Sequence, residues 1–154
     1  MSQETSSDPQ AVLRAFEAAA AAFFVKAQRV PGARQRQPGA CGDWSAQNIL
    51  AHLEGWAAEA LRRYARYPYG VGKINYNIDA FNAVSVRRRA SVDYDEVLAL
   101  LQTRCAALLE AARARSDEQH IQDGRYLEWL RILTHEFETH GAQLAALAGA
   151  VEAQ

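Results

Sequence analysis

The fold is decided near the end of the chain, by the stretch THEFETHGAQL at residues 134–144. Apolar residues around it recur at alternating three- and four-residue steps, which is typical of one face of an α-helix. The face comprises Leu130, Leu133, Phe137, His140, Leu144 and Leu147. His140 therefore stands in line with core-facing residues, and Glu136 lies one turn before it. Because burying a carboxylate and an imidazole without partners is costly, this helix requires a partner for both.

Two interpretations satisfy that requirement, and the residues alone leave both open. The first is a divalent metal ion held by Glu136 and His140 at i, i+4 spacing, with His52 of a second helix as third ligand. Two histidines and one carboxylate suit zinc, and also nickel, iron or manganese. The second is a hydrogen-bonded polar core without metal. His135 is less well placed than His140, because it lies about 100° around the helix from Glu136.

Further amphipathic helices precede this one, and no segment alternates as a β-strand does. Asp8-Pro9 predicts the start of a first helix that ends near Arg29. Ser45 caps a second helix, which ends at residues 68–70, a Pro-Tyr-Gly turn. A third helical region begins near residue 77 and carries an interruption at residues 91–93, which fits a kink or a complete break. After a polar connection over residues 116–124, the last helix covers residues 125–148.

These segments predict an all-α fold, a four-helix bundle in which facing side chains build a site in the core. The 154 residues suit a single domain over residues 8–150, preceded by a disordered lead at residues 1–7. A net charge of −1 argues against a nucleic-acid partner. The apolar runs are too short to span a membrane. Cys41 and Cys105 form no paired motif, so we expect a soluble, cytoplasmic protein.

Two motifs resemble signatures of the DinB/YfiT-like superfamily of metalloenzymes. DWSAQNILAHLEGW at residues 43–56 is similar to its second-helix motif, in which a Trp-Ser cap leads to a histidine ligand. EFETHGAQL at residues 136–144 is similar to its last-helix motif. Most members carry histidine at the position of Glu136, but the branch of mycothiol-dependent maleylpyruvate isomerase has a His/Glu/His triad. Residues 77–82, NIDAFN, also resemble that branch and the ClbS/DfsB-type four-helix proteins.

The resemblance implies a metal site made of His52, Glu136 and His140, in a domain similar to the N-terminal metal-binding domain of that isomerase. It does not extend to the isomerase's additional C-terminal domain. The implied chemistry is a transfer or isomerisation that uses a low-molecular-weight thiol to detoxify a small-molecule substrate. The alternatives are a binding or resistance protein without turnover, with or without metal, and a metal-dependent hydrolase. Family members often pair through bundle helices, so a homodimer is compatible with the resemblance.

Several other side chains have a structural and a functional interpretation. Trp56, Tyr76 and Phe81 are candidates for the wall of an apolar pocket, or simply for the core. The arginine run at residues 87–89 is a candidate anion site, although a solvated helix face is the more common role of such a run. We expect the remaining polar candidates to face solvent: Glu59, His120 and Glu138.

Overall fold

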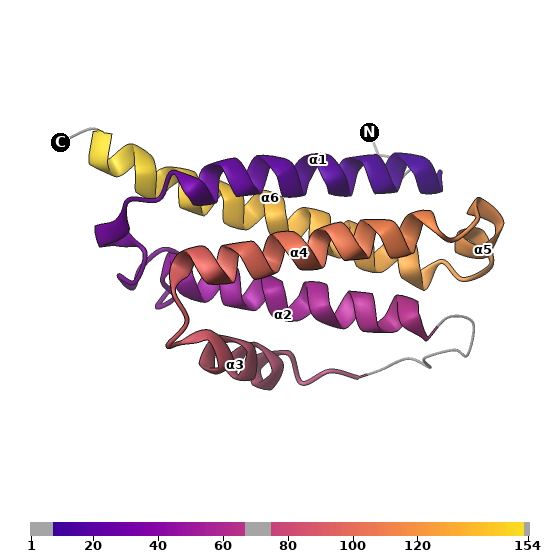
Figure 1. The fold of residues 1–154 in the computed structure, drawn as a ribbon, viewed down its shortest axis with the longest axis horizontal. Coiled ribbons are helices and arrows are strands. Elements are labelled where there is room, and N and C mark those ends of the chain that lie inside the picture. Colours follow the sequence, from indigo (N-terminus) through magenta and orange to yellow (C-terminus); the bar gives the residue numbers. More distant parts are fainter. Residues whose placement is uncertain (1–7, 67–74, 153–154) are drawn as a thin grey trace.

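The computed structural model of the chain describes residues 8–66 and 75–152, and these residues are almost entirely helical (Figure 1). The helices are α1 (Pro9–Gln28), α2 (Ala46–Ala65), α3 (Ile78–Arg89), α4 (Tyr94–Arg113), α5 (Asp117–Gln122) and α6 (Arg125–Glu152). A short 3-10 helix, Gly32–Arg34, lies between α1 and α2. The predicted all-α fold is confirmed. The disordered lead at residues 1–7 and the turn at residues 68–70 lie outside the described residues.

The four longest helices form the bundle, and α3 is added on its outside (Figure 1). α1 packs against α4 and α6, while α2 packs against α4, α6 and α3. The predicted face of the last helix is buried in this core: Leu130, Leu133, Phe137, His140 and Leu144 are each at most 6% exposed. Each such leucine or phenylalanine contributes about 1.5–3 kcal/mol by leaving water. Burial of this stripe therefore fixes which side of α6 faces inward.

Side-chain caps set the beginnings of several helices, as the sequence predicts. The Asp8 side chain accepts a hydrogen bond from the backbone N–H of Gln10, with Pro9 at the first helical position. Ser45 and Asn48 form a reciprocal capping box at the start of α2. The last helix begins at residue 125, as predicted. Among the described residues, none of the helices combines the length and apolar character needed to cross a bilayer.

The interruption at residues 91–93 is a complete break between α3 and α4. Carbonyl groups at the end of a helix need donors from elsewhere, and here those donors come from distant residues. The Gln47 amide donates to the carbonyls of Arg89 (3.1 Å) and Val92 (2.6 Å). The Arg36 guanidinium donates to the carbonyls of Ala90 (2.8 Å) and Val92 (3.0 Å). These contacts stabilise the connection between α3 and α4.

α3 lies so close to α2 that only glycine fits at their crossing. A Cβ atom on Gly55 would overlap both the Cβ and the hydroxyl of Ser85. The Ser85 hydroxyl in turn donates to the carbonyl of Phe81 within α3 (3.0 Å). Gly55 thus sets the distance at which α3 packs against α2.

The expectation that His120 faces solvent is wrong. The polar connection contains the short helix α5, and His120 is only 2% exposed. Its Nε2 atom lies 3.1 Å from the hydroxyl of Tyr64, which is itself fully buried. Tyr64 comes from α2, so its contact with α5 is invisible to local sequence periodicity. Burial lowers the pKa of His120, because the charged imidazolium loses its hydration.

We predict that Gly55→Ala lowers the free energy of unfolding by about 1–3 kcal/mol, because the new methyl group forces α3 away from α2. Gly149→Ala is the matched control, since a Cβ at Gly149 meets no atom and alanine favours a helix. Urea denaturation of both variants measures the difference. Equal stability of the two variants would contradict the close approach of α2 and α3.

We further predict that stability decreases as the pH falls below roughly 6.5, where the unfolded chain gains a proton on His120 that the folded chain resists. The lowered pKa of His120 in the folded state fixes this sign. In His120→Gln the amide retains a partner for Tyr64 but does not titrate. Urea midpoints measured at about pH 7 and about pH 5 should therefore converge in this variant relative to wild type. An unchanged pH dependence would assign the effect to other groups.

Candidate metal centre

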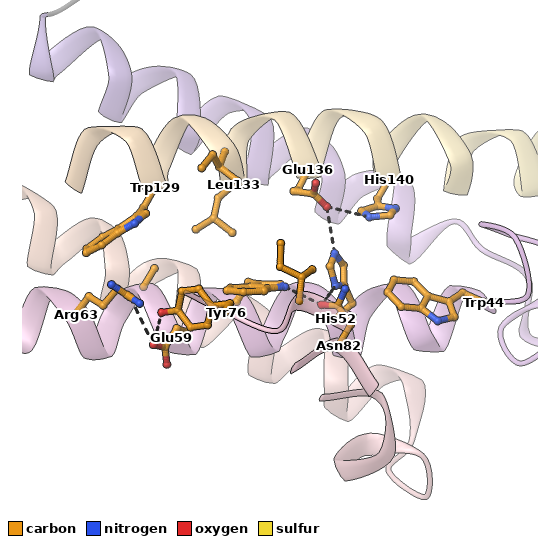
Figure 2. Close-up of a pocket in the computed structure, with 14 residues that line it drawn as sticks. Trp44, His52, Glu59, Arg63, Tyr76, Asn82, Trp129, Leu133, Glu136 and His140 are labelled. Carbon is orange, nitrogen blue, oxygen red and sulfur yellow. Dashed lines mark hydrogen bonds and ion pairs between the residues drawn. The ribbon is translucent and has the colours of Figure 1, made fainter. Parts of the chain in front are cut away.

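The three predicted ligands come together at the seam between α2 and α6 (Figure 2). Glu136 Oε2 lies 3.1 Å from His52 Nε2 and 3.2 Å from His140 Nε2. One ligand atom from each residue lies within 4.8 Å of the others. Both histidines are nearly buried, whereas the Glu136 side chain is 36% exposed. His135 lies on the exposed side of the same helix and takes no part in this cluster.

Each imidazole is oriented by an amide oxygen behind it. Asn82 Oδ1 of α3 lies 3.0 Å from His52 Nδ1, and Gln143 Oε1 lies 2.7 Å from His140 Nδ1. An oxygen behind Nδ1 requires a proton there, so the lone pair of the neutral ring is on Nε2. Both Nε2 atoms face Glu136, so the amide oxygens turn the two rings toward one point.

Trp56 fixes the orientation of the Asn82 amide. Its indole Nε1–H donates to Asn82 Oδ1 over 2.8 Å, and an indole nitrogen can only donate. The atom that faces both Trp56 and His52 is therefore the oxygen of the amide rather than its nitrogen. The contacts run from Trp56 through Asn82 to His52, and they assign the His52 tautomer. The ring of Trp44 also packs against the ring of His52, with centroids 4.9 Å apart.

This arrangement fits a divalent cation by its donor chemistry. Two imidazole lone pairs and one carboxylate oxygen point at one another, so a proton or a cation must lie between them to offset their repulsion. Imidazole nitrogen and carboxylate oxygen are the ligands that zinc and its first-row neighbours accept. Imidazoles held by a second hydrogen bond are also typical of metal sites. His52, Glu136 and His140 are therefore a chemically suitable ligand set.

The charge of Glu136 is held in the ionised state by its neighbours. Contacts with His140 Nε2, and then with His52 Nε2, hold the pKa of this carboxyl well below its usual range, because a proton or a cation at these nitrogens favours the charged carboxylate. Partial burial opposes this effect without reversing it. At neutral pH the cluster thus offers one full negative charge to a cation, with two nitrogen donors beside it.

The cluster opens into a cavity of about 500 Å³ between α2, α6 and the start of α3. This volume is in the range of small-molecule sites. The middle of the cavity is apolar, and its lining includes Trp56, Ala60, Ile132 and Leu133. Trp56 and Tyr76 line it as predicted. Phe81 does not line the cavity; it stacks on Trp56 with ring centroids 4.0 Å apart.

The end of the cavity remote from the cluster is polar (Figure 2). Glu59 and Arg63 of α2 lie there beside Tyr76 and Trp129. The expectation that Glu59 is solvated is wrong, because it is 8% exposed and accepts a 2.7 Å hydrogen bond from the Tyr76 hydroxyl. Arginine partners on the same helix compensate its buried charge. Glu138, by contrast, is exposed as predicted.

The arginine run at residues 87–89 does not act as one unit. Arg87 and Arg88 are exposed, whereas Arg89 forms an ion pair with the buried Glu54 over 3.2 Å. Arg104 approaches the same carboxylate from α4 at 3.4 Å. Glu54 therefore joins α2 to α3 and α4, and Arg89 is engaged in this ion pair rather than in an anion site.

Sequence reasoning did not assign roles to four of the residues that build this site: Asn82, Gln143, Arg63 and Trp129. The role of Gln143 could have been predicted, because this residue lies three positions after His140 on the same helix face. Asn82 acts on a ligand from another helix, thirty positions away, and no local pattern connects the two. The signal for Asn82 appears only when α3 is placed against α2.

We predict that Asn82→Leu weakens zinc binding by about 10- to 100-fold, the usual effect of removing a hydrogen bond behind a histidine ligand. Asn82→Asp should restore most of the affinity, because a carboxylate oxygen again accepts from His52 Nδ1. Competition with a chromophoric chelator measures both values. Equal zinc affinities of the leucine and aspartate variants would contradict the role of Asn82 in orienting His52.

The chain also resembles a known family over most of its length. The family model described as the mycothiol maleylpyruvate isomerase N-terminal domain matches residues 13–145. No curated protein and no solved structure matches the chain. The matched region covers α2 and the part of α6 that carries the His/Glu/His cluster, as well as α3 and α4. The chain belongs to the mycothiol maleylpyruvate isomerase N-terminal domain family, a member of the DinB-like superfamily.

Proposed function

We propose that this protein is a divalent-metal-dependent enzyme that uses a low-molecular-weight thiol to modify a small molecule, by transfer or isomerisation, in detoxification. His52, Glu136 and His140 would hold the metal, for which zinc is the first choice, and nickel, iron or manganese are the others. The reducing cytoplasm, where such thiols occur, is the expected location. The homodimer remains a prediction.

One observation carries the proposal: two Nε2 lone pairs and an ionised carboxylate converge at the edge of an apolar cavity. The hydrogen bonds that Asn82 and Gln143 accept from the two Nδ1–H groups hold the rings in this direction. A metal-free polar core would need a proton on Nε2 in addition to the Nδ1 protons that the amides already accept, so that the rings would have to be charged. The metal interpretation therefore explains the geometry better than a hydrogen-bonded pair does.

A divalent ion in such a site lowers the pKa of a coordinated thiol or water, and so supplies a nucleophile at neutral pH. The residues of the chain would hold this ion and exclude water from the nucleophile. Glu136 contributes a negative charge that reduces the ion's net charge, and it is the ligand on the open side of the cluster. The apolar lining excludes water from a thiolate and strengthens its attack on an electrophilic carbon. In a transfer, the carbon–sulfur bond would form while the bond between that carbon and its leaving group breaks, and the thiol proton would pass to solvent or to the leaving group.

We predict that the purified protein binds about one zinc ion per chain, measured by elemental analysis after dialysis. His52→Ala and His140→Ala should lose this ion, because each removes one of three ligands. His135→Ala is the matched control, since His135 belongs to the same helix but is exposed. A wild-type protein without bound metal after incubation with zinc or nickel would remove the basis of the proposal.

We predict that the zinc-loaded protein binds one of three thiols, namely mycothiol, bacillithiol or glutathione, with release of a proton. Calorimetry in buffers of different ionisation enthalpy measures the affinity and the proton together. The corresponding disulfide is the control, because it has no thiol proton to release. Binding of metal without binding of any thiol would contradict the thiol-dependent reaction and would favour hydrolysis by activated water.

A further inference from the structure

We propose that the cavity selects substrates with an apolar body and a terminal carboxylate, and that Arg63 binds this carboxylate at the end remote from the metal cluster. This inference deepens the proposed function, since it names the class of substrate that the same cavity would take. It is carried by the burial, the partners and the position of Arg63.

Arg63 is a buried cation with an unused donor. The residue is 5% exposed, and among the described residues its Nη2 atom has no hydrogen-bond partner. A buried guanidinium nitrogen without an acceptor is costly, so its position requires an explanation. Arg63 lines the cavity, and its side chain lies at the cavity's end in Figure 2. An acceptor carried by a ligand would complete its hydrogen bonding.

The charges around Arg63 leave a positive charge in excess. Its counter-ion Glu59 lies 3.4 Å from Arg63 Nε but is shared with Arg62, which donates to both carboxylate oxygens at 3.0 and 2.8 Å. The Tyr76 hydroxyl donates to the same carboxylate. One carboxylate therefore serves two guanidinium groups and a phenol. An anion fits this end better than a neutral acceptor does, because it compensates the excess charge.

Two aromatic rings contact the guanidinium group of Arg63. The Arg63 Cζ atom lies 4.8 Å from the ring centroid of Tyr76 and 4.4 Å from that of Trp129. These contacts are attractive, because the ring faces carry negative charge density, and they restrict the movement of the guanidinium group. A guanidinium group that is held in place binds a planar carboxylate at a lower cost in entropy.

The distance between Arg63 and the metal cluster indicates the length of a substrate that would contact both. Arg63 follows His52 by eleven residues in α2, which is about three turns, or roughly 16 Å, on the same face. Trp129 precedes His140 by the same interval in α6, and the two pairs face each other across the seam (Figure 2). Between them lie Ala60 and Leu133, which offer no polar contact. A substrate that reaches both ends thus has an apolar middle.

The test uses matched ligands that differ only at the anionic end. Octanoate and octanol are titrated into the metal-free full-length protein, so that the carboxylate cannot bind to zinc. Mercaptooctanoic acid and mercaptooctanol are titrated into the zinc-loaded protein. All three tryptophans of the chain line the cavity, so intrinsic fluorescence reports binding. We expect the acid of each pair to bind about tenfold more tightly than the alcohol, as for a charge-assisted hydrogen bond.

Three variants assign that preference to Arg63. Arg63→Met should abolish the preference for the acid while leaving the affinity for the alcohol unchanged. Arg63→Lys keeps the positive charge and should retain part of the preference. The lysine variant also serves as the test if the methionine variant fails to fold. Glu59→Gln should raise the affinity for the acid a few-fold, because it removes the competing charge and keeps an acceptor for Tyr76. Arg66→Met is the matched control: it removes one charge from an exposed position one turn further along.

The two arms separate this inference from the proposed function. Equal affinity of the wild type for octanoate and octanol would overturn the inference, whatever the zinc-loaded protein does. A preference for octanoate that survives in both Arg63 variants would also overturn it. A preference for octanoate that Arg63→Met removes, together with mercapto compounds that bind the zinc-loaded protein no more tightly than octanoate and octanol bind the metal-free protein, would support the inference while contradicting thiol-dependent chemistry.

Discussion

The convergence of three acceptor atoms at one point between α2 and α6 is the constraint on which the site depends. His52 Nε2, His140 Nε2 and Glu136 Oε2 repel one another unless positive charge lies between them. The fold does not relieve this repulsion by turning the rings, because Asn82 and Gln143 hold the opposite nitrogen of each. The bundle thereby keeps the arrangement ready for a cation, at a cost to the stability of the metal-free protein.

The helix α6 packs against α1 on one side and against α2 on the other, and the two contacts differ. Toward α1, Phe137 packs edge-on against Phe23 and Phe16, with ring centroids 5.2 and 5.9 Å apart. Toward α2, the same helix lines a cavity with a charged group at each end. Dense packing on one side stabilises the helix that the other side leaves incompletely packed. Function and stability are thus assigned to different faces of one helix.

α3 links the position of the helices to the chemistry of the cluster. Its approach to α2 is fixed by Gly55, and its end by donors from Gln47 and Arg36. Asn82 lies on this helix, so its distance from His52 depends on that packing. The orientation of one histidine ligand therefore rests on the contacts that hold α3 against α2 and fix its end.

The sequence by itself determined the long helices and the Glu136–His140 pair, because helical periodicity, caps and i, i+4 spacing are local properties of the chain. The sequence also indicated His52, through the motif at residues 43–56. The tertiary structure alone decided the break after α3, the burial of His120 and Glu59, and the roles of Asn82 and Arg63. Each of these depends on a donor, acceptor or ring from another helix, or on a neighbour buried with it, and residue order does not encode such distances until the helices pack.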